Sequence, residues 1–196
     1  MPDLTDNDVP PEEKRMGQLV TDLFPLCRSI LGPATRATLD RIAVEIPIEI
    51  RSVRSGTAVL DWEVPDEWEI RDAFIARPGS SERIVDFRAS NLHVVSHSTP
   101  VDRIISLEEL QPHLHSLPDR PELVPYRTSY YAPTWGFCLA DDMRRALQRG
   151  DYQVVIDSSL QPGELSWGEL VVPGDEPAEV LLTTHICHPS MANDNL

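Results

Sequence analysis

Four side chains that can bind a metal ion or take part in hydrolysis lie close together near the end of the sequence. His185, Cys187, His188 and Asp194 follow the apolar run 180–182. This run predicts a buried strand, and because side chains alternate along a strand, His185 and Cys187 should share one face while His188 points away from Cys187. The carboxyl ends of strands in open α/β sheets are also where such sheets bind ligands.

The turn-rich residues that follow are expected to return Asp194 to the end of this strand. Neutral imidazole and carboxylate are ligands of hydrolytic zinc, which keeps one position open for a water molecule that loses a proton near neutral pH. Asp194 has two oxygens and can bridge two zinc ions, and Asn193 and Asn195 can orient it through hydrogen bonds. The sequence therefore predicts a zinc site with His185 and Asp194 as ligands.

Other interpretations of these residues stay open. Asn193 and Asp194 are common turn residues, and Cys187 could be a small buried apolar side chain instead of a neighbour that supports the ligands. A nucleophile pair of Cys187 with His188 is disfavoured because adjacent strand residues point apart. A structural zinc finger is disfavoured because no paired CxxC motif occurs.

Composition narrows the possible partners. The chain of 196 residues carries a net charge of −15, which disfavours binding to nucleic acid. No apolar stretch is long enough to cross a bilayer, and the polar N-terminus lacks the features of a secretory signal. Three cysteines at wide spacing predict a reducing compartment without disulfides. We therefore expect a cytoplasmic protein without membrane partners.

The elements that would position the site change in character along the chain. Apolar residues recur at helical spacing after Pro11 and again after Pro33, and Pro25 and Pro47 are expected to end these two helices. Short alternating runs separated by turn residues follow, which predicts a small antiparallel β unit. Further on, the pair Ser106 and Glu109 forms a capping-box pattern, and "LADDMRRALQRG" predicts a helix.

The fold class expected from this order is α/β, with a mixed peptidase-like sheet that is only partly present and a small β-rich insertion. The N-terminal helices occupy 1–46 and the β-rich inserted domain 47–130. Residues 131–196 are expected to begin the α/β sheet and to carry the first metal-ligand motif, the sheet domain being cut short at its C-terminus. His93 and His97 are expected to be exposed on a strand of the insertion. The aromatic stretch 127–138 is expected to pack at the junction or to line a substrate cleft.

Six short stretches together resemble a bacterial family of aminopeptidase-like proteins of unassigned function. They are "LFPLCRSILG", "VRSG", "DWEVPDEW", "LHVVSHSTPV", "TSYYAPTWGFC" and "HICHPSMANDNL". The resemblance spans 19–196 and places the chain near the zinc aminopeptidase superfamily that includes leucyl aminopeptidases. Members of the narrower family often occur beside genes for surface-polysaccharide biosynthesis.

The resemblance implies a peptidase-like α/β domain with a small inserted domain and, later, a winged helix. Matched residue by residue, His185 takes the position of the zinc-binding histidine and Asp194 that of the bridging aspartate. Cys187 stands where the wider superfamily has the aspartate that orients this histidine, which puts ordinary aminopeptidase activity in doubt. The spacing from His185 to Asp194 is shorter than in typical aminopeptidases, which leaves His188 as a rival ligand.

Relatives of this kind continue with a glutamate general base and further ligands. The resemblance therefore implies an N-terminal fragment that is inactive alone. One or two zinc ions are expected in the complete protein, whereas zinc binding by this chain is expected to be weak or absent. The expected substrate is a peptide or an N-acyl or aminoacyl small molecule, and homo-oligomers are possible. The alternative is a non-catalytic module that keeps the fold and serves polysaccharide biosynthesis or protein interaction. A third hypothesis, a cysteine hydrolase that uses Cys187, predicts inactivation by thiol reagents without a metal.

Overall fold

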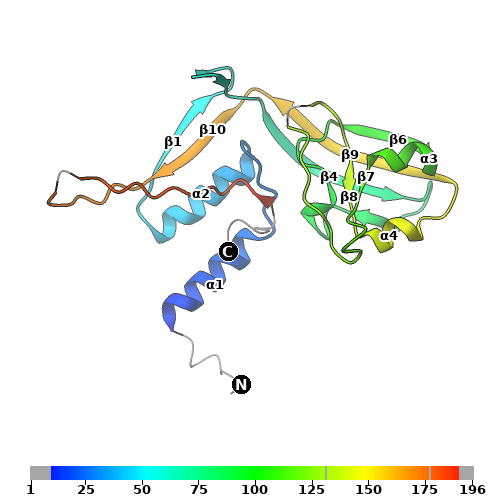
Figure 1. Ribbon diagram of the computed structural model, residues 1–196, viewed down its shortest axis with the longest axis horizontal. Helices are drawn as coiled ribbons and strands as arrows, with labels where there is room; N and C mark the ends of the chain where they lie inside the picture. The colour runs from blue at the N-terminus through cyan, green and yellow to red at the C-terminus, as the bar shows by residue number, and fades with distance from the viewer. Residues whose placement is uncertain (1–9, 131, 177, 190–196) are drawn as a thin grey trace.

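The computed structural model describes residues 10–130, 132–176 and 178–189 of the chain. Two helices, α1 (Pro11–Leu23) and α2 (Pro33–Glu45), lie on one side of the molecule, and a four-stranded sheet lies on the other (Figure 1). Each helix begins with a proline, whose fixed φ suits a first helical turn, and a further proline follows shortly after its end. Both helices predicted from periodicity are confirmed.

The four-stranded sheet is antiparallel throughout, in the order β5–β4–β9–β6. Its strands are β4 (Glu67–Ala76), β5 (Arg83–Asp86), β6 (Val101–Ser106) and β9 (Asp151–Gln161). Apolar side chains alternate along them and bury one face of the sheet against the connecting segments. The resulting core contains Trp68, Ala73, Ile75, Val85, Val94, Leu110, Leu114, Phe137, Leu139, Tyr152, Val154 and Ile156.

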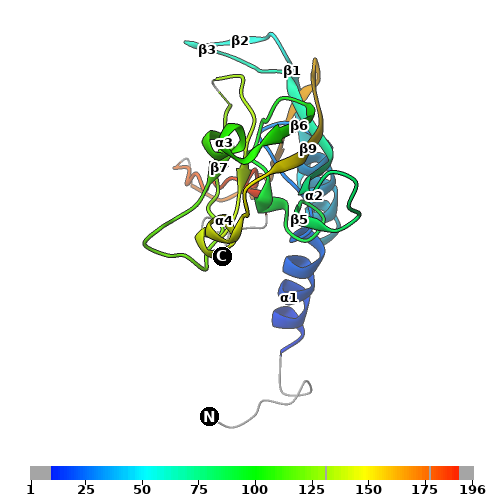
Figure 2. The same ribbon diagram turned by 90° about the vertical axis from the view of Figure 1, so that its right-hand side faces the viewer.

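Strand β9 continues into β10 (Glu164–Glu169) after only two residues, and β10 pairs with β1 (Glu49–Arg54) in a separate antiparallel ribbon. A short hairpin, β2 (Ala58–Val59) with β3 (Trp62–Glu63), lies between β1 and β4 in the chain and reaches one end of the molecule (Figure 2). At the bend between β9 and β10, a Cβ on Gly163 would lie 2.7 Å from the Cβ of Glu67. This bend therefore requires glycine.

Short elements cover the buried face of the sheet. They are η2 (Asn91–His93), α3 (Leu107–Leu110), η3 (Gln111–His113), β7 (Leu114–His115), β8 (Phe137–Cys138) and α4 (Asp141–Ala146). The predicted capping box is present, because Ser106 and Glu109 each bind the backbone N–H of the other. The predicted helix after Leu139 is shorter than its pattern and ends at Ala146.

The last third of the chain corrects two expectations, although the predicted α/β class is confirmed. The apolar run 180–182 is not a strand: its side chains are at least 86% exposed, because it has no strand to pair with among the described residues. Strand β9 pairs with β4 and β6, so the antiparallel sheet extends past residue 130 to include 151–161. The division of the chain into three domains stays a prediction.

Candidate functional site

Two cavities meet at the segment 185–188. One, called here the apolar cavity, has a volume of about 530 Å³ and lies between α2, β10 and the segment 182–187. The other, called the polar cavity, has a volume of about 320 Å³. Besides the segment 185–188, it is lined by residues from 29–30, 96–97 and 126–130. His185 and Cys187 line both cavities, so their segment forms the wall between them.

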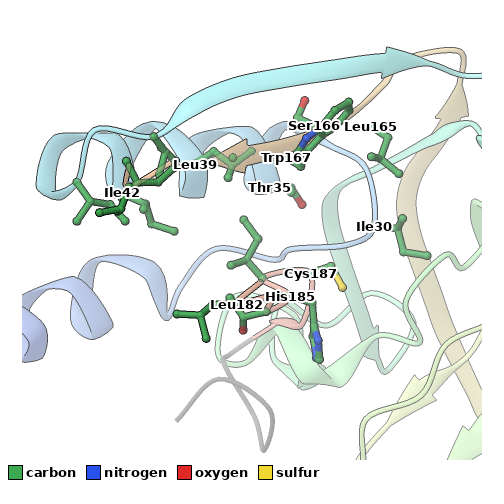
Figure 3. A pocket seen from close by; sticks show the side chains of 17 residues that line it. Ile30, Thr35, Leu39, Ile42, Leu165, Ser166, Trp167, Leu182, His185 and Cys187 are labelled. Carbon is green, nitrogen blue, oxygen red and sulfur yellow. The ribbon is translucent and has the colours of Figure 1, made fainter. Parts of the chain in front are cut away.

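Figure 3 shows how the wall is built. Leu39 and Trp167 project from α2 and β10 into the apolar cavity, and Leu182 lies on its opposite side. The imidazole ring of His185 is turned away from α2, and this residue is exposed. The first predicted metal ligand therefore lies at an accessible edge where the two cavities join.

Arg28 holds the backbone of the wall segment 185–188 in place. The residue is 1% exposed; its Nη1 donates to the Leu23 carbonyl at 2.5 Å and its Nε donates to the His188 carbonyl at 3.0 Å. Its Nη2 has no hydrogen-bond partner within the part of the chain that the structure describes. Burial lowers the pKa of the guanidinium. A single buried side chain thus ties the end of α1 to the backbone of the predicted ligand segment.

His188, the rival ligand, is held by packing. It is 7% exposed, its ring centroid lies 4.0 Å from that of Tyr126, and its Nδ1 lies 2.8 Å from the Pro189 carbonyl oxygen. A hydrogen bond from Nδ1 to this carbonyl leaves only Nε2 to bind a metal. His188 was expected to face away from Cys187, yet both residues line the polar cavity, because the segment is not a strand.

The other half of the predicted zinc site lies outside the described residues. Asp194, Asn193 and Asn195 are all among the residues that the structure does not describe. Among the residues that the structure describes, no group of three or more His, Cys, Asp or Glu side chains is placed to hold a metal ion. Of the predicted ligand pair, His185 is the described member. It is an exposed residue at the predicted position, and its imidazole suits one ligand of a zinc ion. The zinc site therefore stays a prediction.

His97 is a cavity residue whose role sequence reasoning missed. Both His93 and His97 were expected to be exposed strand residues, but they are 9% and 6% exposed. Neither lies in a strand: His93 belongs to η2 and His97 to a turn. His97 lines the polar cavity, and its backbone has a φ of 65°, in the left-handed region that non-glycine residues seldom adopt. Burial lowers the pKa of its imidazole to about 4, so the ring is neutral at pH 7.

The turn that carries His97 is fixed from several sides. The Ser98 carbonyl accepts hydrogen bonds from Trp68 Nε1 at 3.0 Å and from Ser158 Oγ at 2.7 Å. The His97 ring itself stacks on Trp68, with centroids 5.5 Å apart, and meets the edge of Tyr130 at 5.2 Å. A non-glycine residue keeps a left-handed backbone conformation only where contacts with the surrounding structure hold it there. In the sequence, the signal for this turn was the run "SHSTP", which is rich in turn residues.

Comparison with known proteins places this geometry in context. Residues 67–159 match a family model described as "Domain of unknown function (DUF2172)". The chain is 50% identical over 178 residues to a protein of Clostridium acetobutylicum whose name proposes a role in polysaccharide biosynthesis and an aminopeptidase-like domain. The chain is similar to an aminopeptidase-like protein. The match covers 91% of this chain and 41% of that relative.

A solved structure gives the same result at the level of the fold. The crystal structure of a candidate peptidase from Clostridium acetobutylicum matches with a TM-score of 0.88 and 47% identity, over 93% of this chain and 43% of the other. The expected peptidase-like fold is thereby confirmed. The chain spans about two fifths of the length of the relatives it matches. None of the helices in the described ranges is long and apolar enough to span a membrane.

Proposed function

We propose that the chain contributes the first metal ligands of a zinc-dependent, aminopeptidase-like hydrolase that acts on a peptide or on an N-acyl or aminoacyl small molecule. The observation that carries the proposal is the place of His185, exposed at the junction of two cavities in a fold that matches a candidate peptidase. Ligand sites are concave and combine apolar walls with a few polar groups, as these cavities do.

The residues of the chain have distinct tasks in this proposal. His185 and Asp194 would bind the ion, and zinc, when bound, supplies a water molecule whose proton is easily lost. Arg28 holds the backbone of the ligand segment through the His188 carbonyl. The apolar cavity offers space for an aliphatic side chain beside the metal ligands, and the polar cavity offers space for polar parts of the substrate.

Zinc titration by calorimetry tests this proposal. We expect the chain to bind zinc only weakly, because it supplies few ligands, and we expect His185→Ala and Asp194→Ala each to weaken this binding further, at least about tenfold. His113→Ala is the matched control, because His113 packs on Trp135 and does not line either cavity. Equal zinc affinity in all four proteins would refute the proposed ligands.

The second candidate is a non-catalytic module that binds a ligand for polysaccharide biosynthesis. Cys187 favours it, because a thiol takes the place that the resemblance gives to a carboxylate, and the name of the Clostridium acetobutylicum relative is in line with it. Hydrolysis assays with the zinc-loaded, full-length relative separate the two functions. Turnover of aminoacyl or N-acyl substrates supports the hydrolase, whereas zinc binding without any turnover supports the module.

A further inference from the structure

The polar cavity contains a buried polar atom that the described protein does not satisfy. Nε2 of His97 is inaccessible to solvent and has no hydrogen-bond partner among the described residues. A buried polar atom left without a partner costs free energy, and proteins satisfy the great majority of such atoms. An imidazole that stays buried and unsatisfied beside a cavity therefore points to a group that enters the cavity and binds it.

The lining of the polar cavity indicates which chemistry that group has. Aromatic rings and hydroxyls surround the cavity, from Tyr126, Thr128, Tyr130 and Ser96, and no Asp, Glu, Lys or Arg occurs among its described lining residues. Burial keeps the His97 ring neutral at pH 7. A fully charged group would find no opposite charge there, whereas an uncharged amide or hydroxyl finds both hydrogen-bonding partners and apolar ring faces.

The position of His97 also suits recognition. The ring is clamped between Trp68 and Tyr130, and the backbone of its turn is held by hydrogen bonds to Ser98. Such a ring loses little freedom when it binds a ligand, which is the condition for a strong, selective contact. On the other side of the same cavity lies His185, the proposed zinc ligand.

We infer that the polar cavity is a subsite for an uncharged hydrogen-bonding group of the ligand, an amide or a sugar hydroxyl, and that Nε2 of His97 is its recognition atom. The subsite combines one wall from residues 96–130, inside the stretch that matches the family model, with a second wall from 185–188. The inference rests on the proposed function only where it equates this ligand with the substrate, because binding to His97 requires no metal.

Nitrogen NMR of the histidine rings tests the inference on the ¹⁵N-labelled full chain at pH 7 with a chelator present. The probes are N-acetyl-L-leucinamide, which has uncharged amides, and methyl β-D-glucopyranoside, which has uncharged hydroxyls. We expect one of them to shift the His97 Nε2 resonance, assigned through its contacts with Trp68, in a saturable manner, and the active probe identifies the ligand chemistry. Binding that leaves this resonance unchanged, or no binding of either probe, overturns the inference.

His97→Asn supplies the second measurement, because asparagine tolerates a left-handed backbone while its shorter amide cannot replace Nε2. We expect the dissociation constant of the active probe to rise about five- to tenfold, as for one lost hydrogen bond. His113→Asn, at a ring that also stacks on an aromatic side chain, should leave it unchanged. If His97→Asn does not fold, the wild-type ring spectrum still decides.

The subsite and the proposed function can fail separately. If the probe shifts His97 while His185→Ala and Asp194→Ala leave zinc affinity unchanged in the calorimetric titration, the subsite stands and the hydrolase proposal falls. If zinc binds through His185 and Asp194 but neither probe reaches His97, the subsite falls and the hydrolase proposal stands.

Discussion

At the scale of single residues, the candidate site depends on side chains that are buried without the usual partners. Arg28 is almost wholly inaccessible, yet its described hydrogen bonds go to two backbone carbonyls and not to a carboxylate. Hydrogen bonds from charged groups are stronger than neutral ones, and a long side chain also fills space in the interior. Arg28 therefore sets the position of the segment 185–188 as well as the local stability.

Replacing Arg28 with alanine tests this role. We expect the free energy of unfolding to fall by about 2–4 kcal/mol, because two carbonyls lose a charged donor and a cavity forms. Urea unfolding followed by circular dichroism measures the change. Arg71→Ala is the control: Arg71 pairs with Asp157 at the exposed sheet surface, so it should unfold almost as the parent does. Equal effects of the two substitutions would refute the role of Arg28.

Single residues were also the hardest to predict. The pattern around His97 alternates like a strand, and only the distant Trp68 and Tyr130 show why the residue is buried in a turn. Such contacts join residues that are far apart in sequence, and local pattern does not contain them. The exposure of the run 180–182 was missed for a related reason: a strand exists only with a pairing partner, which apolar composition does not specify.

At the scale of elements, local signals were sufficient for α1, α2, α3 and β4. Prolines at the ends of α1 and α2, the capping box before α3 and the alternation in β4 each act within a few residues, and each of these elements forms as expected. What the sequence did not predict is how the helices attach to the sheet. Arg36 of α2 makes two hydrogen bonds, of 2.7 and 2.8 Å, with Glu67 at the start of β4.

Glu67→Gln tests this attachment and its dependence on pH. The Arg36 hydrogen bonds hold the pKa of the Glu67 carboxyl below its ordinary 4.5, so the ion pair stabilises the fold above that value. We expect the variant to lose about 1 kcal/mol at pH 7, a modest loss because Arg36 is 39% exposed. The stability difference from the parent should shrink as the pH falls from 4.5 through the lower folded pKa.

Urea unfolding at several pH values measures this difference. Glu69→Gln is the matched control on the same strand, because its carboxylate is 40% exposed and lies 3.7 Å from Arg71. A stability difference for Glu67→Gln that does not change between pH 7 and pH 3 would contradict the ion-pair explanation.

At the scale of the whole molecule, apolar side chains cluster on the connection that follows β10. Val171, Val172, Val180, Leu181 and Leu182 are between 79% and 90% exposed. Large exposed apolar patches are rare on isolated proteins and favour association, and these side chains are candidates for such a patch. The apolar cavity lies beside the same connection, since Val172 and Leu182 also line it.

We therefore expect the chain to self-associate as its concentration rises, and we expect replacement of both Val180 and Leu181 with serine to reduce this association. Size-exclusion chromatography with light scattering gives the mass of each species. Leu60→Ser is the control, because Leu60 is fully exposed at the tip of the β2–β3 hairpin and does not belong to the connection after β10. A parent chain that stays monomeric at all concentrations, or equal association in the double variant, would contradict this expectation.

The two ends of the stretch that contains the sheet meet in the fold. Glu67, where β4 begins, is the register partner of Gln161, where β9 ends. The chain therefore leaves the ribbon and returns to it at nearly the same point, and the matching family model covers almost the same stretch, 67–159. A segment whose two ends are neighbours can be inserted into a surface loop of another protein without disrupting the fold of that protein. This geometry suits the stretch that carries His97 to insertion into a host framework, and the polar cavity is complete only where that framework supplies its second wall, as residues 185–188 do here.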